Sequence, residues 1–316
     1  MGTLSNSLSP TREVGMSKVF DEKMDIKVNK TDTFRVYVSR PEDKKEKRLI
    51  FLLHGAGSSS YTWSQIVAGL RRRAYVVAFD ARGHGHSCHS NETDLSEKIL
   101  IQDACDVLER VVTYIRKDVK DKIPVALVGH SLGGAIATKV MERMVSSDIS
   151  TMEPKCLVLI DICEGTAVKS LEHTKAVLQR RPSYFHTVED AVKWSLEGTL
   201  RNTRSARISV PDTLVRETIG GEAGRFRWRT NLLSSYKYWK GWYYGLSKLF
   251  VNLPSKRISK LLVLADVNRL DKALTIAQMQ GQFEMKVIGH SGHFIHEDVP
   301  SALQGVLSEF FGRRLY

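Results

Sequence analysis

Short runs of apolar residues alternate along this chain with longer segments in which apolar residues recur every three or four positions. The short runs are rich in β-branched and aromatic residues and predict eight strands, at 24–28, 34–38, 49–53, 75–79, 125–128, 157–160, 261–264 and 284–288. Helical patterns lie between the later runs, at 63–72, 96–116, 132–144 and 300–311. The inner runs are almost continuously apolar, as strands covered on both faces must be. This alternation predicts an α/β fold, with an eight-stranded, mostly parallel sheet and helices on both faces.

One long interval interrupts the alternation. About a hundred residues separate the strand that ends at Ile160 from the one that begins at Leu261, where a simple crossover needs about twenty to thirty. We therefore expect a cap at 166–255 over the carboxyl ends of the strands, inserted into a core formed by 21–165 and 256–316. Three parts of the cap differ in composition: a helical pattern at 166–198, a Gly-, Arg- and Ser-rich stretch at about 202–226 that we expect to be a mobile loop, and an aromatic-rich end at 228–250. Residues 1–20 are polar and aperiodic, and we expect a flexible leader there.

Composition and charge exclude several classes of protein. A chain of 316 residues that is 42% hydrophobic and 26% charged is neither disordered nor a disulfide-stapled miniprotein. Its net charge is +12, but the basic residues are scattered among acidic ones and form no nucleic-acid motif. No apolar run approaches the roughly 18 residues of a spanning helix, the first residues lack a signal-peptide pattern, and four cysteines are too dispersed for a disulfide framework. We expect an intracellular protein of the cytoplasm or nucleus, with neither nucleic acid nor membrane as a partner.

Residues 125–134, Val-Ala-Leu-Val-Gly-His-Ser-Leu-Gly-Gly, carry the clearest chemical signal. A predicted strand leads into Gly-x-Ser-x-Gly and a predicted helix follows at once, which is the context of a nucleophile elbow. Gly129 and Gly133 leave room for a tight turn that would raise the Ser131 hydroxyl above the edge of the sheet. The helix beginning at Leu132 would direct its amide end, with its partial positive charge, toward a developing oxyanion. Ser131 is thus the candidate nucleophile, and the Leu132 N–H is a candidate oxyanion donor.

A second glycine-rich segment, Leu52-Leu53-His54-Gly55-Ala56-Gly57, ends the third predicted strand. In folds with a nucleophile elbow the loop after the third strand supplies the other oxyanion amide, which here is the N–H of Ala56. The glycines let the backbone approach a substrate carbonyl. His54 and Gly55 are therefore candidate substrate-binding residues.

The general base should follow the last strand, because a serine hydroxyl at its ordinary pKa is a poor nucleophile. His293 fits this place, in the segment Gly289-His290-Ser291-Gly292-His293-Phe294. His290 and His296 compete with it. The spacing of these three histidines also suggests a metal site, but no cluster of Cys or carboxylate residues completes one.

Two aspartates at strand ends compete for the role of the acid that orients the base. Chain order allows both, and the usual place after the seventh strand favours Asp266. Asp161, however, closes a buried strand, where an unpaired carboxylate would be costly and needs a partner such as an imidazole N–H. The residues alone leave this choice open. A further loop, at 82–89, contains three histidines for which structural or substrate-edge roles are favoured: His84, His86 and His89.

Several longer segments resemble protein phosphatase methylesterase, and the likeness extends over nearly the whole chain from about residue 32. They include Leu53-His54-Gly55, residues 129–137 around Ser131, Asp161-Ile162-Cys163-Glu164-Gly165-Thr166-Ala167, Tyr238-Trp239-Lys240-Gly241-Trp242, Arg269-Leu270-Asp271-Lys272, Gln278-Met279-Gln280-Gly281 and His296-Glu297-Asp298. The resemblance implies an α/β-hydrolase fold whose triad falls on Ser131, Asp161 and His293. It implies a serine carboxylesterase that removes the methyl ester from the carboxyl-terminal leucine of the protein phosphatase 2A catalytic subunit, which is then the expected partner.

The expected reaction is a two-step acyl transfer that needs no cofactor. Because a methyl leaving group offers almost no surface to recognise, selectivity must come from the acyl side. Aromatic residues of the cap are candidates for that surface, with packing against the sheet as their alternative role: Trp239, Trp242 and Tyr243. Two other classes remain open, a small-molecule esterase or lipase with the same triad and a non-catalytic regulator that binds the phosphatase.

Overall fold

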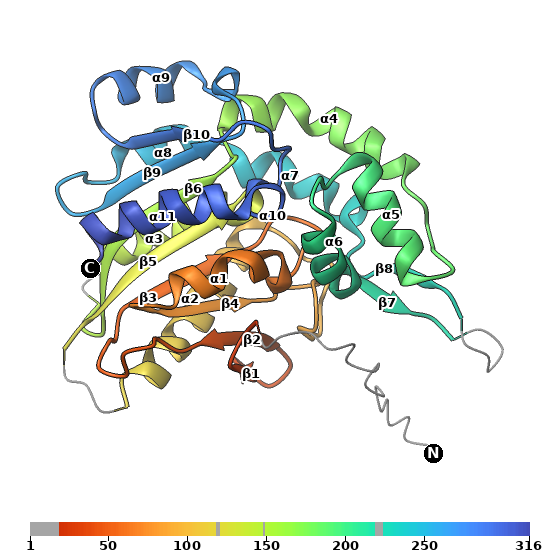
Figure 1. The fold of residues 1–316 in the computed structure, drawn as a ribbon, viewed down its shortest axis with the longest axis horizontal. Helices are drawn as coiled ribbons and strands as arrows, with labels where there is room; N and C mark the ends of the chain where they lie inside the picture. The colour runs from red at the N-terminus through yellow and green to blue at the C-terminus, as the bar shows by residue number, and fades with distance from the viewer. Residues whose placement is uncertain (1–18, 118–120, 148, 219–223) are drawn as a thin grey trace.

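The computed structural model describes residues 19–117, 121–147, 149–218 and 224–316. Its main feature is an eight-stranded sheet in the hydrogen-bonded order β1-β2-β4-β3-β5-β6-β9-β10 (Figure 1). β2 is antiparallel to both of its neighbours, and every other adjacent pair is parallel. The strands are β1 (Glu22–Lys27), β2 (Thr33–Ser39), β3 (Leu49–Leu53), β4 (Tyr75–Phe79), β5 (Ile123–His130), β6 (Met152–Ile160), β9 (Ser259–Leu264) and β10 (Glu284–Val287). The predicted eight-stranded, mostly parallel sheet is confirmed.

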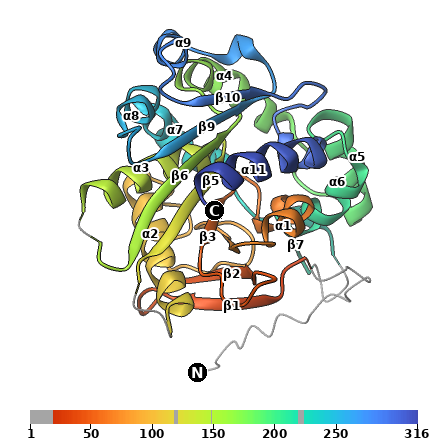
Figure 2. The same cartoon turned by 60° about the vertical axis from the view of Figure 1, so that its left-hand side comes forward.

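Helices cover both faces of the sheet, because its central strands are apolar on both sides. Alternate residues of β3 enter two separate buried clusters, Phe51 on one face and Ile50 on the other. The Phe51 face is covered by α2 (Glu97–Ile115), α3 (Leu132–Ser146) and α8 (Leu246–Asn252). The Ile50 face is covered by α1 (Ser64–Leu70) and α11 (Pro300–Arg314), which extend to the right of the sheet in Figure 2, whereas α2 and α3 lie to its left. Two further helices follow in the chain: α9 (Lys272–Met279) packs against α8, and the short α10 (Ile295–Asp298) packs against α1 and α11.

The cap lies at one side of the sheet and has a small apolar core of its own (Figure 1). It contains α4 (Glu164–Arg180), α5 (Val188–Gly198), α6 (Thr203–Ser209) and the two-stranded hairpin of β7 (Leu214–Arg216) and β8 (Phe226–Trp228). Its core is formed by Phe185, Ala191, Val192, Leu200, Ala206 and Val210.

One expectation about the cap, the loop at 202–226, differs from the structure. The segment at 202–226, expected to be a loop, forms α6, a 3-10 turn and the hairpin; within it, residues 219–223 lie outside the described ranges. The side chain of Asn202 caps α6, and Ala206 and Val210 are buried, which explains why this polar stretch is helical. The aromatic end of the cap, α7 (Tyr236–Tyr243) together with α8, packs into the main core, which is the alternative role given for its aromatic residues. The leader at 1–20 falls almost entirely outside the described residues.

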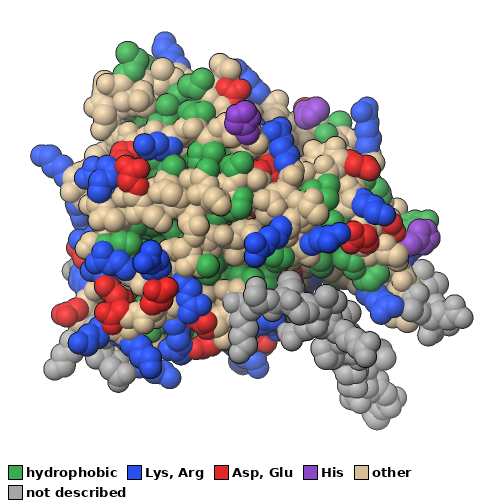
Figure 3. Space-filling view, viewed as in Figure 1, with side chains coloured by type: hydrophobic (Ala, Val, Ile, Leu, Met, Phe, Trp, Pro, Cys, Tyr) green, Lys and Arg blue, Asp and Glu red, His purple; other side chains and the backbone are tan. Residues whose placement is uncertain are grey.

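The surface carries charges of both signs. In the view of Figure 3, Lys and Arg side chains are spread over the visible face and are interspersed with Asp and Glu. Within the described ranges, no helix combines the length and the apolar character that are needed to cross a bilayer.

Candidate active site

Ser131 occupies a strained turn between β5 and α3. Its backbone has φ 51° and ψ −120°, a conformation that a residue with a side chain rarely adopts. Two glycines make the turn sterically feasible: a Cβ at Gly129 would lie 2.3 Å from the carbonyl oxygen of Gly133, and one at Gly133 would lie 2.1 Å from that of Leu53. The Ser131 carbonyl accepts hydrogen bonds from the first turn of α3, so the turn leads directly into the helix. The side chain is thereby presented to a cavity above the sheet.

Two backbone amides beside Ser131 are free to bind an oxyanion. Within the described ranges, neither the Ala56 nor the Leu132 N–H donates a hydrogen bond to another group. Leu132 is the first residue of α3, where N–H groups have no intrahelical acceptor. Ala56 lies in the loop after β3 and lines the same cavity as Ser131. The amide end of α3 adds a partial positive charge at this place.

His293 and Asp161 meet across the carboxyl ends of the strands. The Nδ1 of His293 lies 2.7 Å from Oδ2 of Asp161. The Asp161 carboxylate is fully buried, and it also accepts hydrogen bonds from the Ala265 N–H at 3.0 Å and from the Arg269 guanidinium. Like Ser131, Asp161 has a positive φ, 53°. This arrangement directs the Nδ1–H of His293 to the carboxylate and leaves its Nε2 able to take up a proton.

The competing residues lie elsewhere. Asp266 is exposed, and its side chain accepts from the Asn268 N–H in its own turn, away from His293. His290 is exposed, whereas His296 is buried with its Nε2 2.7 Å from the Thr62 hydroxyl. Within the described ranges, no group of three or more His, Cys, Asp or Glu side chains is placed to hold a metal ion.

A cavity of about 770 Å³ joins the site to the cap. Its lining includes three groups: Ser131, Asp161 and His293 at one end, residues of α4 to α6 along the cap, and the aromatic candidates Trp239, Trp242 and Tyr243. These aromatic side chains are buried in the main core, so they both pack against the core and line the cavity. Burial raises the pKa of Tyr243 to about 12, while its hydrogen bond with the Ser131 side chain acts in the opposite direction. His54 and Gly55 lie outside this lining.

Two buried histidines join the loop after β3 to the loop after β4. The Nε2 of His84 accepts the Gly57 N–H at 2.9 Å, and its Nδ1 donates to the carbonyl of Arg82 at 2.7 Å. His54 joins the two loops from the other side: its Nδ1 donates to the carbonyl of Gly55, and its Nε2 accepts from the Ala81 N–H. Burial lowers the pKa of His84 to about 3 and that of His54 to about 4, so both stay neutral and keep these tautomers at neutral pH. They fix the segment that carries the Ala56 amide.

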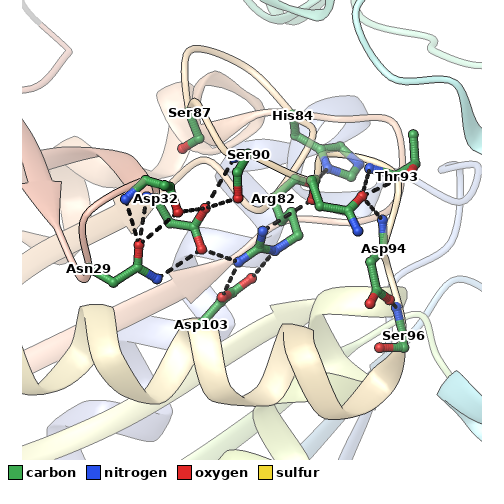
Figure 4. Close-up of polar contacts among 12 residues, drawn as sticks. Asn29, Asp32, Arg82, His84, Ser87, Ser90, Thr93, Asp94, Ser96 and Asp103 are labelled. Atoms are coloured by element: carbon green, nitrogen blue, oxygen red, sulfur yellow. Dashed lines mark hydrogen bonds and ion pairs between the residues drawn. The ribbon is translucent and has the colours of Figure 1, made fainter.

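Arg82 anchors the second of these loops (Figure 4). Its guanidinium donates to both oxygens of Asp103 on α2, at 2.7 and 2.8 Å, and to Asp32 at 3.1 Å. All three side chains are buried, and both carboxylates are hydrogen-bonded to the one guanidinium. Sequence reasoning assigned neither this network nor the contact of Arg269 with Asp161. Both depend on residues that are distant in the chain, and a single arginine in a loop gives no signal of them.

Known proteins match both the fold and the sequence. Residues 50–303 match the model of the alpha/beta hydrolase family. The chain is 38% identical over 302 residues to the probable protein phosphatase methylesterase 1 of Caenorhabditis elegans, covering 94% of this chain and 77% of that protein. It is 34% identical over 349 residues to the human protein phosphatase methylesterase 1, covering 96% of this chain and 85% of that protein.

Solved structures resemble the fold at much lower identity. The structure of E-2-(acetamidomethylene)succinate hydrolase superposes with a TM-score of 0.72 at 16% identity, covering 92% of this chain and 99% of that one. A thioesterase domain from the curacin biosynthetic pathway superposes with a TM-score of 0.63 at 18% identity, covering 90% of this chain and 98% of that one. At these identities the likeness concerns the fold alone.

Proposed function

This chain belongs to the protein phosphatase methylesterase family of the α/β hydrolases, and we propose that it removes the methyl ester from the carboxyl-terminal leucine of the protein phosphatase 2A catalytic subunit. One observation carries the proposal for the reaction. The Asp161 carboxylate lies 2.7 Å from the imidazole of His293, in the cavity onto which the Ser131 elbow opens. This is the constellation of a serine esterase.

In the proposed reaction, His293 accepts the Ser131 proton at Nε2 while Ser131 attacks the ester carbonyl. Asp161 keeps the proton of His293 on Nδ1 and stabilises the imidazolium that forms. The amides of Ala56 and Leu132 receive the oxyanion, and removal of one such donor typically costs on the order of 10²–10³ in rate. Methanol leaves with the proton from His293, and water repeats the sequence to release a carboxylate and restore Ser131.

The cavity supports a substrate that is large on its acyl side. A methyl group needs almost no pocket, whereas about 770 Å³ of cavity extends from the site into the cap. A folded phosphatase would present its carboxyl terminus into this cavity. We also propose an intracellular location, which is supported by the free thiols of the four cysteines: Cys88, Cys105, Cys156 and Cys163.

The decisive experiment compares hydrolysis of methylated protein phosphatase 2A by the wild type, by Ser131→Ala and by Ser234→Ala. Ser234 is an exposed serine whose hydroxyl donates to the carbonyl of Asn231, and its variant should behave as the wild type. Ser131→Ala should lose all measurable turnover. Retained turnover would refute the serine mechanism, and faster turnover of simple acyl esters than of the methylated phosphatase would favour a small-molecule esterase. An unchanged cellular effect of Ser131→Ala would indicate a non-catalytic regulator.

A further inference from the structure

One face of α4 lines the cavity over the full length of the helix. Lining residues recur at helical spacing from the catalytic end to the far end: Thr166, Ser170, Thr174, Val177 and Arg181. At a rise of about 1.5 Å per residue, these positions cover about 22 Å. No residue of α4 is fully buried: Ala167 and Leu171 pack in part against the main core, while Ser170, Thr174 and Val177 are exposed on the lining face. The cavity is therefore a long groove with α4 as one wall.

A groove of this length fits an extended peptide. At about 3.3 Å per residue, about seven residues of an extended chain would reach from the ester at Ser131 to the far end of α4. The groove is mostly apolar along this path, with Leu178, Trp194 and Trp228 among its lining residues. A charged group at its far end would therefore be a specific point of recognition.

Arg181 supplies that charge. It follows the last residue of α4 and lines the groove. Its guanidinium donates to the carbonyl of Thr230 at 3.1 Å and stacks on the ring of Trp228 at 4.8 Å. Within the described ranges, no carboxylate forms an ion pair with it, and burial alone lowers its pKa to about 10.

Within the described part of the cap, the other arginines are either exposed, as Arg180, Arg201, Arg204 and Arg216 are, or paired with a carboxylate. Arg207 pairs with Glu189, Arg225 and Arg227 pair with Glu217, and Arg229 pairs with Glu92. A partly buried cation without a counter-charge is costly, and an anion brought by a ligand would offset that cost. Trp228 holds one face of the guanidinium, and the Thr230 carbonyl accepts from only one of its nitrogens, so N–H donors remain for a bound group.

We infer that Arg181 binds an acidic side chain of the substrate peptide, within about seven residues of the esterified carboxyl terminus. The inference rests on the proposed function, because it assumes that the ester at Ser131 belongs to a peptide. Arg181 would act as a specificity-determining residue that leaves the chemical step unchanged. Its contribution is a charge-assisted hydrogen bond, which corresponds to a preference of about 10- to 100-fold.

The experiment uses a series of heptapeptide methyl esters with Asp or Asn at each of positions 3 to 7 from the carboxyl terminus. kcat/KM is measured for the wild type, Arg181→Gln, Arg181→Lys and the matched control Arg207→Gln. The wild type and Arg207→Gln should prefer Asp over Asn by about 10- to 100-fold at one position. Arg181→Gln should lose this preference while turning over the Asn peptides as fast as the wild type. Arg181→Lys should keep part of it.

Two results would overturn the inference: a wild type that does not distinguish Asp from Asn at any position, or an Arg181→Gln variant that slows Asp and Asn peptides equally. The latter would indicate that Arg181 only supports the fold of the cap. Hydrolysis of the Asn peptides by the wild type tests the proposed function separately. If no peptide ester is hydrolysed, binding of the same peptides as carboxyl-terminal amides decides the matter. Equal affinity of Asp and Asn peptides for the wild type would then exclude the role of Arg181.

Discussion

The free energy of unfolding of the wild type should fall between about pH 4.5 and pH 8, and replacing Glu297 by glutamine should abolish this fall. Glu297 lies on α10, and its carboxyl group is hydrogen-bonded to the hydroxyls of Thr62 in the core and Ser209 on α6. Burial raises the pKa of this carboxyl from 4.5 to about 8; the two hydroxyls lower it in part, and Asp298 raises it further. Glu297 is therefore a neutral acid at the junction of cap and core over most of the physiological pH range.

The direction of the effect follows from proton linkage. Between pH 4.5 and 8 the folded protein holds a proton on Glu297 that the unfolded chain has released, so the free energy of unfolding falls as the pH rises. The slope is at most about 1.4 kcal/mol per pH unit. Over the interval from 4.5 to about 8, this amounts to about 5 kcal/mol at most. Glutamine keeps the shape and can still bond to both hydroxyls, but it does not titrate.

Urea unfolding followed by tryptophan fluorescence at pH 5, 6, 7 and 8 measures this effect. The wild type and Glu297→Gln should be similar at pH 5, and the variant should be more stable by several kcal/mol at pH 8. The control is Glu189→Gln, an exposed carboxylate on α5 that pairs with Arg207, and it should follow the wild type. If the wild type and Glu297→Gln gave parallel stability curves across this range, the buried acid could not have the raised pKa that the structure gives it.

Two further substitutions test the catalytic geometry. Asp161→Asn should lower kcat on the methylated substrate by on the order of 10⁴, because an amide stabilises the wrong tautomer of His293; a loss below about tenfold in steady-state kinetics would show that another group orients the imidazole. His84→Ala should lower kcat by on the order of 10² with little change in KM, because the Gly57 N–H loses its acceptor and the neighbouring Ala56 amide its fixed direction. A rise in KM at constant kcat in the same assay would place His84 in substrate binding instead.

The sequence was sufficient for the central strands of the sheet because they are short apolar runs that are buried on both faces, as in β3 and β4. The chain order of motifs around Ser131 and His293 likewise rests on local signals, since the glycines and strand ends are adjacent to the residues they position. The choice between Asp161 and Asp266 was different. Both close a strand, so the residues alone left the choice open and the family resemblance favoured Asp161; the structure shows that Asp161 faces His293 while Asp266 caps its own turn.

The cap was harder to predict because polar composition hid its helical structure. In α6 the hydroxyl of Ser209 bonds back to the carbonyl of Ser205, and that of Ser205 bonds to the carbonyl of Glu297, so residues typical of loops are satisfied within a helix. The aromatic residues of α7 indicated that this helix would be buried, but not which part of the protein it would pack against. Trp242 packs into the main core, and its indole N–H donates to the carbonyl of Leu95, which is far away in the chain.

The backbone conformation at Ser131 is unfavourable for the stability of the fold, although catalysis needs a serine at this place. Glycine adopts φ 51° with ψ −120° far more readily than serine, so the residue most comfortable at this bend is one that has no hydroxyl. Selection for stability alone would therefore favour glycine over Ser131, and only selection for catalytic turnover maintains the serine. In a homologue that has lost its activity, we expect the serine at position 131 to be replaced first, which would leave an unstrained turn between β5 and α3 and an unchanged sheet.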